Sequence, residues 1–268
     1  MTKFKDIINE LEKHFNPNLQ ENYDNAGIQL DAGVEEITGC LITLDITEKV
    51  VDEAIFKKCN LIVSHHPLIF GKGLMKITDS TATERILKKC IINSISIYTS
   101  HTNCDNSPGG TSAVMAAALG LQHVQTLLPD KEIIADDKII KCGSGAIGDL
   151  PVAIATEDFL RRLKKCFECG AVRYSEIIKS EVKRIAICPG SGSFLLSRAI
   201  EQGADVFISG DFTYHKFFEA DSKIIIADIG HYESECGIKH VFSTILEKKF
   251  VNFVVKISEE NTNPIKYL

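Results

Sequence analysis

Five residues in the 268-residue sequence have the types and positions of metal ligands: His65, His66, Asp105, His231 and Glu235. His65 and His66 stand side by side in the segment SHHP. Adjacent side chains on a regular strand face opposite sides, so both can point into one site only at a strand end. Pro67 supplies that end, because proline fixes its own φ and donates no ladder hydrogen bond. Taken alone, the motif also fits a helix-capping or turn histidine.

Two further motifs extend the candidate ligand set. Asp105 lies four residues after His101 in HTNCD, where an aspartate that bonds its own turn is the ordinary alternative. In GHYESE, a helix that begins at His231 would place His231 and Glu235 at positions i and i+4 on one face. A glutamate here can instead complement a helix dipole, a role that fits Glu233 better.

Together these motifs offer imidazole nitrogens and carboxylate oxygens. Such a set suits Zn, Fe, Mn or Ni and contains too few soft ligands for a thiolate site. We therefore predict two divalent metal ions per chain as cofactors. Three further residues could take part, namely His101, Asp211 and His215. They could transfer protons, orient the ligands through hydrogen bonds, or contact the substrate.

The helices and strands that position these residues can be predicted from the sequence. Runs of β-branched residues alternate with helical stretches, which predicts an α/β fold with largely parallel strands. In the first half, strands are expected at 40–45, 61–67 and 94–105, and helices from Thr47 to about 58, at 82–90 and at 110–120. The second half repeats the order, with a strand at 184–192 that ends in a Gly-rich turn and a helix at 194–203. The segments 205–215 and 223–235 then follow on either side of a helical 216–220, before a long C-terminal helix. The candidate residues fall just beyond predicted strands, at the sheet edge where open α/β proteins bind ligands.

The repeated order indicates an internal duplication. Asp45 precedes His65 by 20 residues, and Gly190 precedes Gly210 by 20. The expected fold is α/β, with two similar interlocked lobes at 1–124 and 181–268 and the metal site in the cleft between them. Residues 125–180 are expected to form a connecting segment with its own helix at 156–166.

The composition and charge of the chain argue against several classes of function. Apolar residues make up 44% and charged residues 25% of the chain, and the net charge is −6. This balance gives no reason to expect nucleic-acid or anionic-membrane partners. No apolar run is long enough to span a bilayer, and the N-terminal segment resembles an amphipathic helix rather than a signal peptide. A cytoplasmic location is therefore expected.

The remaining cysteines and histidines have ordinary interpretations. Nine cysteines, an odd number without a secretory signal, indicate free thiols. Cys166 and Cys169 form a C-x-x-C pair with no second ligand pair, so a structural zinc site is not expected. Cys104 is interpreted as a packing residue. His14, His123 and His240 are interpreted as ordinary surface or partly buried histidines.

With these motifs in place, the sequence resembles the Nif-three-like family of dinuclear-metal proteins, often described as type 2 GTP cyclohydrolase I homologues. The resemblance spans nearly the whole chain through YDNAGIQL, LDIT, IVSHHPLIF, YTSHTNCDN, PGSGS, GADVFISGDFTYH and GHYESE. It implies two metals held by His65, His66, Asp105, His231 and Glu235, with Glu235 bridging. It also implies a ring-shaped homohexamer, a trimer of dimers, with the sites facing an internal cavity.

The chain departs from the family pattern in three places. Tyr23 stands where the family usually has Trp, and Cys104 stands where it commonly has Leu. The segment 125–180 is too short for the domain that longer relatives insert between the halves. The two substitutions do not affect a proposed ligand.

Two classes of function remain open from the sequence. The first is a metal-dependent hydrolase of a nucleotide-like or phosphorylated small molecule, in which two ions activate a water and hold a phosphate or ring carbonyl. GTP ring opening is implied by the resemblance alone, because no P-loop or other Gly-rich phosphate motif is present. The alternative is a non-catalytic metal-handling, chaperone or scaffold protein.

Overall fold

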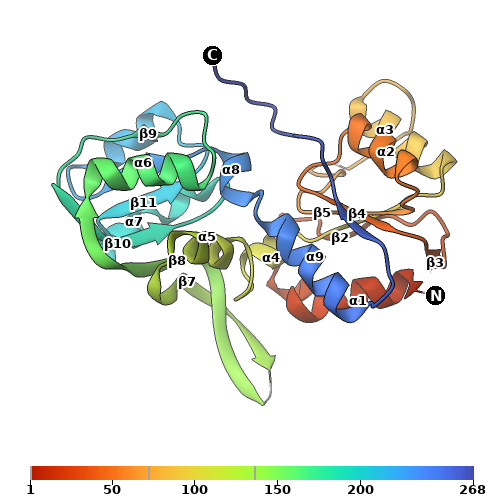
Figure 1. Ribbon diagram of the computed structural model, residues 1–268, viewed down its shortest axis with the longest axis horizontal. Helices are drawn as coiled ribbons and strands as arrows, with labels where there is room; N and C mark the ends of the chain where they lie inside the picture. The colour runs from red at the N-terminus through yellow and green to blue at the C-terminus, as the bar shows by residue number, and fades with distance from the viewer. Residues whose placement is uncertain (1, 72, 136) are drawn as a thin grey trace. The chain divides into compact units, whose positions relative to one another are not determined.

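The chain folds into two compact α/β units, each built from two separate stretches of sequence. The computed structural model describes residues 2–71, 73–135 and 137–268 (Figure 1). Unit 1 contains Met1–Cys104 and Ile238–Pro264, and unit 2 contains Asp105–Gly237 and Ile265–Leu268. These units divide the chain differently from the predicted segments 1–124, 125–180 and 181–268, because the C-terminal helix packs in unit 1.

Unit 1 is built on a five-stranded sheet in the order β13-β4-β5-β6-β2. Its strands are β2 (Gly27–Leu30), β4 (Cys40–Thr43), β5 (Leu61–Ser64), β6 (Ser96–Thr99) and β13 (Val255–Ile257). All run parallel except β2, which is antiparallel to β6. A separate two-stranded sheet joins β1 (Thr2–Lys3) to β3 (Glu36–Ile37). Since β4, β5 and β6 end at one edge, the residues that follow them are brought together there.

Helices cover the sheet of unit 1. They are α1 (Phe4–His14), α2 (Glu48–Phe56), α3 (Ala82–Ile92) and α9 (Ile238–Lys249), with a short 3₁₀ turn, η1 (Pro17–Leu19). Residues of α2 and α3 share one core with Leu41, Ile62 and Ile97 of the strands. Helices α1 and α9 lie side by side (Figure 1), and just beyond α1 Phe15 meets Phe242 edge to face with ring centroids 5.4 Å apart.

Unit 2 is built on a six-stranded sheet in the order β7-β8-β10-β11-β12-β9. Its strands are β7 (Gln122–Ala135), β8 (Lys138–Ala155), β9 (Arg173–Tyr174), β10 (Glu181–Ile187), β11 (Val206–Ser209) and β12 (Ile225–Asp228). Strands β10, β11 and β12 are parallel, and the other three are antiparallel to their neighbours. The helical elements are α5 (Thr111–Leu119), α6 (Thr156–Cys166), η2 (Gly192–Leu195), α7 (Leu196–Glu201), η3 (Tyr214–Ala220) and α8 (His231–Glu235), preceded by α4 (Thr102–Asp105) at the boundary of the units.

Alternation along the central strands of unit 2 buries side chains on both faces of the sheet. Val206 and Ile208 belong to one core, which contains residues of α5 and α6. Phe207, between them, belongs to the opposite core with residues of η2 and α7. Strands buried on both faces are continuous apolar runs, which is why the sequence identified them.

Several expected elements are confirmed. Thr47 caps α2 by accepting a hydrogen bond from the Val50 amide at 3.3 Å. The expected helix at 156–166 is α6, and the C-terminal helix is α9. Each unit contains three consecutive parallel strands, which agrees with the inferred duplication, and the duplication itself stays a proposal.

Two expectations need correction. The predicted strand 94–105 ends at Thr99, and Thr102–Asp105 form the short helix α4 instead. The segment 125–180 is more than a connection, because β8 joins the main sheet of unit 2 and β7 pairs with it as a long hairpin. Pro129 and a register shift between Leu128 and Lys131 interrupt the alternation that would have revealed these strands.

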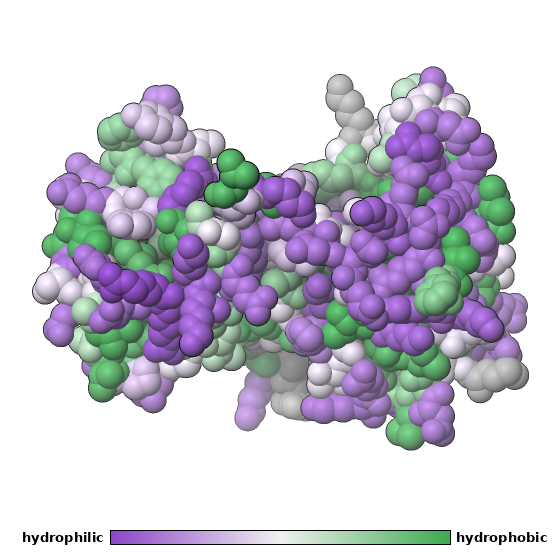
Figure 2. Space-filling model, turned by 45° about the horizontal axis from the view of Figure 1, so that its top comes forward, coloured by the Kyte–Doolittle hydropathy of each residue, from purple (hydrophilic) through white to green (hydrophobic). Residues whose placement is uncertain are grey.

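The surface and the cysteines are ordinary for such a fold. The face in Figure 2 is mainly hydrophilic, with apolar residues in small separate patches. Among the described residues, no helix has the length and apolar character needed to cross a membrane. All nine cysteines are free, and Cys104 is buried as expected.

Asp205 ties the starts of two central strands of unit 2 together. Its carboxylate accepts hydrogen bonds from the Lys183 amide at 2.8 Å and the Arg184 amide at 2.9 Å, and it pairs with Lys179. Burial acts to raise the pKa of Asp205, but these hydrogen bonds outweigh burial and hold the pKa below its ordinary value.

Asp205→Asn should therefore lower the free energy of unfolding at pH 7 by about 1–3 kcal/mol. Because the folded pKa is depressed, the carboxylate stabilises the fold above the unfolded pKa of about 3.9, and this contribution disappears as the pH falls toward the folded value. Urea unfolding at pH 7 and pH 3 should show the difference from wild type shrinking at the lower pH. Asp221→Asn, which removes an exposed partner of Lys223, should leave stability unchanged. A difference of equal size at both pH values would contradict this role.

Candidate metal centre

Three histidines gather at one edge of the sheet in unit 1. His65 and His66 directly follow β5, and His101 follows β6, its parallel neighbour. A metal-ligating nitrogen from each ring lies within 4.8 Å of the other two. The ring centroids are 5.0 to 5.5 Å apart. The His66 amide donates to the Leu44 carbonyl at 3.0 Å, which extends the strand pairing to the turn before Pro67.

Each of these rings is oriented by a hydrogen bond at Nδ1. His65 Nδ1 donates to the carbonyl of Ser100 at 2.9 Å, and His66 Nδ1 donates to Asp45 at 2.7 Å. His101 Nδ1 donates to Asp24 at 2.8 Å. A carbonyl or carboxylate accepts only, so Nδ1 carries the proton and Nε2 keeps its lone pair for a ligand. Metal-ligating histidines have this arrangement.

Asp24 is itself firmly held. It accepts hydrogen bonds from the Thr102 amide at 3.0 Å and from the Thr102 hydroxyl, in addition to His101. Burial acts to raise the pKa of Asp24, but the bonds from His101 and Thr102 outweigh burial and lower the pKa to about 2. Asp24 therefore stays ionised and fixes the tautomer of the His101 ring.

In unit 2, α8 begins at His231, as the interpretation of GHYESE required. His231 Nε2 lies 3.0 Å from Glu235 Oε2, one turn further along the helix. His231 Nδ1 donates to Asp211 at 2.7 Å, and Asp211 also accepts from the Ser191 hydroxyl at 2.6 Å. This places Asp211 as an orienting group, one of the roles considered for it from the sequence.

The charges around His231 show what the neighbouring carboxylates require. Burial acts to lower the pKa of His231, but Asp211 and Glu235 outweigh burial and raise the pKa to about 11. The hydrogen bond from His231 in turn holds the pKa of Asp211 below its ordinary value. The imidazolium therefore supplies positive charge to carboxylates that a bound cation could neutralise instead.

Asp105 and Glu235 add a pair of carboxylates in unit 2. They offer oxygens within 4.8 Å of each other, and the Thr111 hydroxyl donates to Asp105 at 2.6 Å. Burial raises the pKa of Cys188, and the charges of Asp105 and Glu235 raise it further. Cys188 therefore remains a thiol, and the groups that could hold an ion here offer oxygen and nitrogen atoms.

Two glycines make room for these side chains. Gly190 has φ of +64°, and a Cβ atom there would collide with Glu235 Oε1. A Cβ atom at Gly210 would lie 2.8 Å from the His231 amide nitrogen. The PGSG turn and the glycine after β11 are therefore needed to let α8 approach the strand ends.

The structure thus groups most of the candidate residues by unit, with His65, His66 and His101 in one and Asp105, Asp211, His231 and Glu235 in the other. His215 lies on η3 with its ring centroid 5.3 Å from that of Tyr214, and among the described residues it belongs to no group of metal-ligating atoms. The sequence analysis missed Asp24, Asp45 and Ser100 as orienting acceptors. Asp24 in YDN and Asp45 in LDIT could have been identified from the sequence as candidate partners, because both lie near a strand end.

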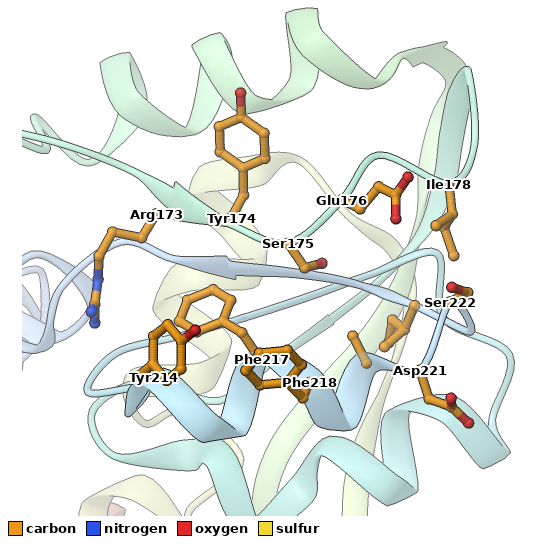
Figure 3. Close-up of a pocket in the computed structure, with 12 residues that line it drawn as sticks. Arg173, Tyr174, Ser175, Glu176, Ile178, Tyr214, Phe217, Phe218, Asp221 and Ser222 are labelled. Atoms are coloured by element: carbon orange, nitrogen blue, oxygen red, sulfur yellow. The ribbon is translucent and has the colours of Figure 1, made fainter.

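Unit 2 also has a pocket of about 640 Å³ beside its edge strand (Figure 3). One wall is the segment from Arg173 to Glu176, and the opposite wall is η3, with Tyr214, Phe217 and Phe218. Tyr214 is 72% exposed and Phe218 is 68% exposed, and their ring centroids are 5.4 Å apart. In Figure 3, Arg173 and Glu176 lie toward opposite ends of the pocket.

A buried carboxylate links this pocket to the His231 group within unit 2. Arg173, which lines the pocket, pairs with Asp228, which is 3% exposed. Asp228 accepts from the backbone amides of Phe212 and Gly230, both at 3.0 Å. These two residues adjoin Asp211 and His231 in the chain, so the pocket wall and the candidate ligands share one hydrogen-bonded framework.

These observations define a class: an α/β protein in which histidines and carboxylates at strand ends could hold metal ions. The chain belongs to the DUF34/NIF3 family, whose model, described as Duf34/NIF3 (NGG1p interacting factor 3), matches residues 2–264. This confirms the resemblance drawn from the sequence motifs.

Curated relatives of similar length match nearly the whole chain. A Campylobacter jejuni protein named GTP cyclohydrolase 1 type 2 homolog is 34% identical over 271 residues, which cover 99% of each chain. A Clostridium perfringens protein of the same name is 32% identical over 274 residues, covering 99% of this chain and all of the relative.

Solved structures confirm the fold. A Bacillus cereus protein related to NIF3 matches all of this chain and 99% of its own with a TM-score of 0.90 at 24% identity. A hypothetical protein from Staphylococcus aureus matches 99% of each chain with a TM-score of 0.88 at 29% identity.

Asp211→Asn should weaken zinc binding by about 10- to 100-fold, because the His231 ring loses the carboxylate that fixes its tautomer and raises its basicity. Competition with a chromophoric chelator would measure the affinity. Asp221→Asn, an exposed aspartate of the same unit, is the matched control and should bind zinc like wild type. Unchanged affinity in Asp211→Asn would show that this hydrogen bond does not serve metal binding.

Gly190→Ala tests the space around Glu235. The added methyl group must displace Glu235 or strain a left-handed backbone, so zinc affinity should fall while the protein stays folded. Gly203→Ala has the same backbone strain at φ of +70° with nothing within 4 Å, and it should cost stability without changing affinity. Equal zinc affinities in the two variants would argue against Glu235 as a ligand.

Proposed function

We propose that this protein is a metal-dependent hydrolase with a dinuclear metal centre that acts on a nucleotide-like or phosphorylated small molecule. The observation that carries the proposal is the shared orientation of four histidines, His65, His66, His101 and His231. Each has its Nδ1 held by a carbonyl or carboxylate at 2.7 to 2.9 Å, which prepares Nε2 to bind an ion or move a proton.

The proposed ligands are imidazoles and carboxylates. The histidines offer imidazole nitrogens, whereas the carboxylates of unit 2 require positive charge, so a divalent ion suits both kinds of ligand. Glu235 has two oxygens and suits a bridging position. The five proposed ligands are His65, His66, Asp105, His231 and Glu235.

His101 is proposed to move protons. Its ring is held by an ionised carboxylate, Asp24, which stabilises the imidazolium when the ring takes up a proton. A ring nitrogen of His101 lies within 4.8 Å of one from His65 and one from His66, so His101 would face a substrate held there. Two divalent ions would supply Lewis acidity and lower the pKa of a coordinated water.

The pocket of unit 2 supports a substrate with a planar ring. Exposed aromatic rings on η3 offer stacking surfaces for a base, and polar side chains at its ends can bind substituents. The names of the relatives, GTP cyclohydrolase 1 type 2 homolog, fit a nucleotide substrate.

The experiment is a hydrolysis screen with nucleotides and phosphoesters on protein loaded with Zn, Mn or Fe. Glu235→Gln keeps the shape of the side chain and removes its charge, so it should lose metal and reduce hydrolysis by at least about 100-fold. Glu219→Gln, an exposed partner of Lys216, is the control and should keep both.

Two outcomes would count against this function. Equal hydrolysis by Glu235→Gln and wild type would remove Glu235 from the site. A wild type that binds two ions and hydrolyses no member of the screen would favour the metal-handling alternative.

A further inference from the structure

The segment that follows β13 is tied to α2 by a buried carboxylate. Its first residue, Ser258, donates its amide to the Ile42 carbonyl at 2.7 Å, which continues the pairing of β13 with β4. The Glu53 carboxylate on α2 accepts hydrogen bonds from the Ser258 hydroxyl and, at 2.9 Å, from the Glu259 amide. Lys57, at the end of α2, pairs with Glu53 at 2.6 Å and with Glu259 at 2.7 Å. Since β13 runs parallel to β4, this segment leaves the sheet at the edge where the histidines of unit 1 lie.

Thr262, in the same segment, contacts the carboxylate that orients His66. A local turn surrounds Thr262, because the Asn263 amide donates to the Asn261 side chain at 3.0 Å. The Thr262 hydroxyl donates to Asp45 Oδ2 at 2.7 Å, and His66 Nδ1 donates to Asp45 Oδ1 at 2.7 Å. The hydroxyl and the ring therefore bond to the two oxygens of one carboxylate.

The other two carboxylates that orient candidate histidines also accept a hydrogen bond from a hydroxyl. The ring, the carboxylate and the hydroxyl belong in one case to His101, Asp24 and Thr102, and in the other to His231, Asp211 and Ser191. The terminal torsion of an aspartate has broad minima, so a second donor helps to fix the plane of the carboxylate. Fixing that plane also fixes the ring that the carboxylate holds. The recurrence at three carboxylates indicates that the hydroxyl serves the histidine.

We propose that Thr262 is a positioning residue of the metal centre, which acts through Asp45 to orient the His66 ring with Nε2 available to an ion. This inference rests on the proposed metal centre. It adds to that centre a residue that lies 196 positions after His66 and outside the sequence motifs that identified the ligands. A change at Thr262 should therefore alter metal affinity although Thr262 is not itself a ligand.

Thr262→Val tests this role, because it keeps the branched shape of the side chain and removes the hydroxyl. Zinc affinity, measured by competition with a chromophoric chelator, should fall by about 3- to 10-fold, since the loss of a direct partner of a ligating histidine costs about 10- to 100-fold and Thr262 acts one bond further away. Thr262→Ser keeps the hydroxyl and should bind zinc like wild type.

Thr244→Val is the matched control. The Thr244 hydroxyl donates to the His240 carbonyl within α9 at 2.7 Å, so its loss removes a hydrogen bond of unit 1 that involves no candidate ligand. Thr244→Val should bind zinc like wild type.

The metal-free protein gives a second readout, which a loss of stability alone would not change. Nitrogen NMR at mildly alkaline pH, where an ordinary imidazole is neutral, reports which ring nitrogen carries the proton. In wild type, His66 should carry the proton on Nδ1. In Thr262→Val, the His66 signals should move toward the average of the two tautomers, whereas those of His101, held by Asp24, should stay in place.

The inference is overturned if Thr262→Val binds zinc like wild type, if its His66 signals are unchanged, or if Thr262→Ser loses as much affinity as Thr262→Val. A wild type that binds no zinc would instead refute the proposed metal centre. The His66 signals of the metal-free protein would then still decide whether Thr262 orients the ring.

Discussion

The orientation of the histidine rings is the constraint on which the rest of the site depends. An imidazole can bind a metal through Nε2 only if Nδ1 carries the proton, and an acceptor placed at Nδ1 enforces that tautomer. In unit 1 the acceptors are Asp24, Asp45 and the Ser100 carbonyl, and in unit 2 the acceptor is Asp211. The parallel strands serve this purpose, since they end together and bring rings and acceptors to one edge.

The two units contribute different chemistry. Unit 1 offers imidazole rings, while in unit 2 the carboxylates of Asp211 and Glu235 outweigh burial and raise the pKa of His231 to about 11. Glu235 is a buried acid and is costly without a cation, so the proton on His231 supplies positive charge that a divalent ion could supply instead. The glycines at 190 and 210 serve the same end, because side chains there would displace Glu235 or α8.

Local patterns in the sequence were enough to predict the central strands, the cap at Thr47, the helix at 156–166 and the register of His231 and Glu235. Each depends on neighbours within a few residues. The partners of the histidines were missed because they are distant in the chain. Asp24 and His101, for example, are 77 residues apart, and only tertiary structure brings them to 2.8 Å.

The long hairpin was missed for a different reason. Its outer strands carry exposed isoleucines on both faces, Ile134 and Ile139 on one and Ile140 on the other, and Pro129 and a register shift interrupt β7 just before them. Period-two alternation arises from burial on one face, so a ribbon that leaves the sheet lacks that signal. The pocket at η3 combines segments from 173 to 224 and could not be assembled from any single motif.

We propose above all that two ions are held through imidazole and carboxylate ligands, namely His65, His66, Asp105, His231 and Glu235. X-ray absorption at the zinc edge of the fully loaded protein tests it most directly. We expect a first shell of nitrogen and oxygen, the outer-shell scattering of imidazole rings, and a zinc–zinc contribution. A sulfur shell, or a spectrum with neither imidazole nor zinc–zinc scattering, would contradict it.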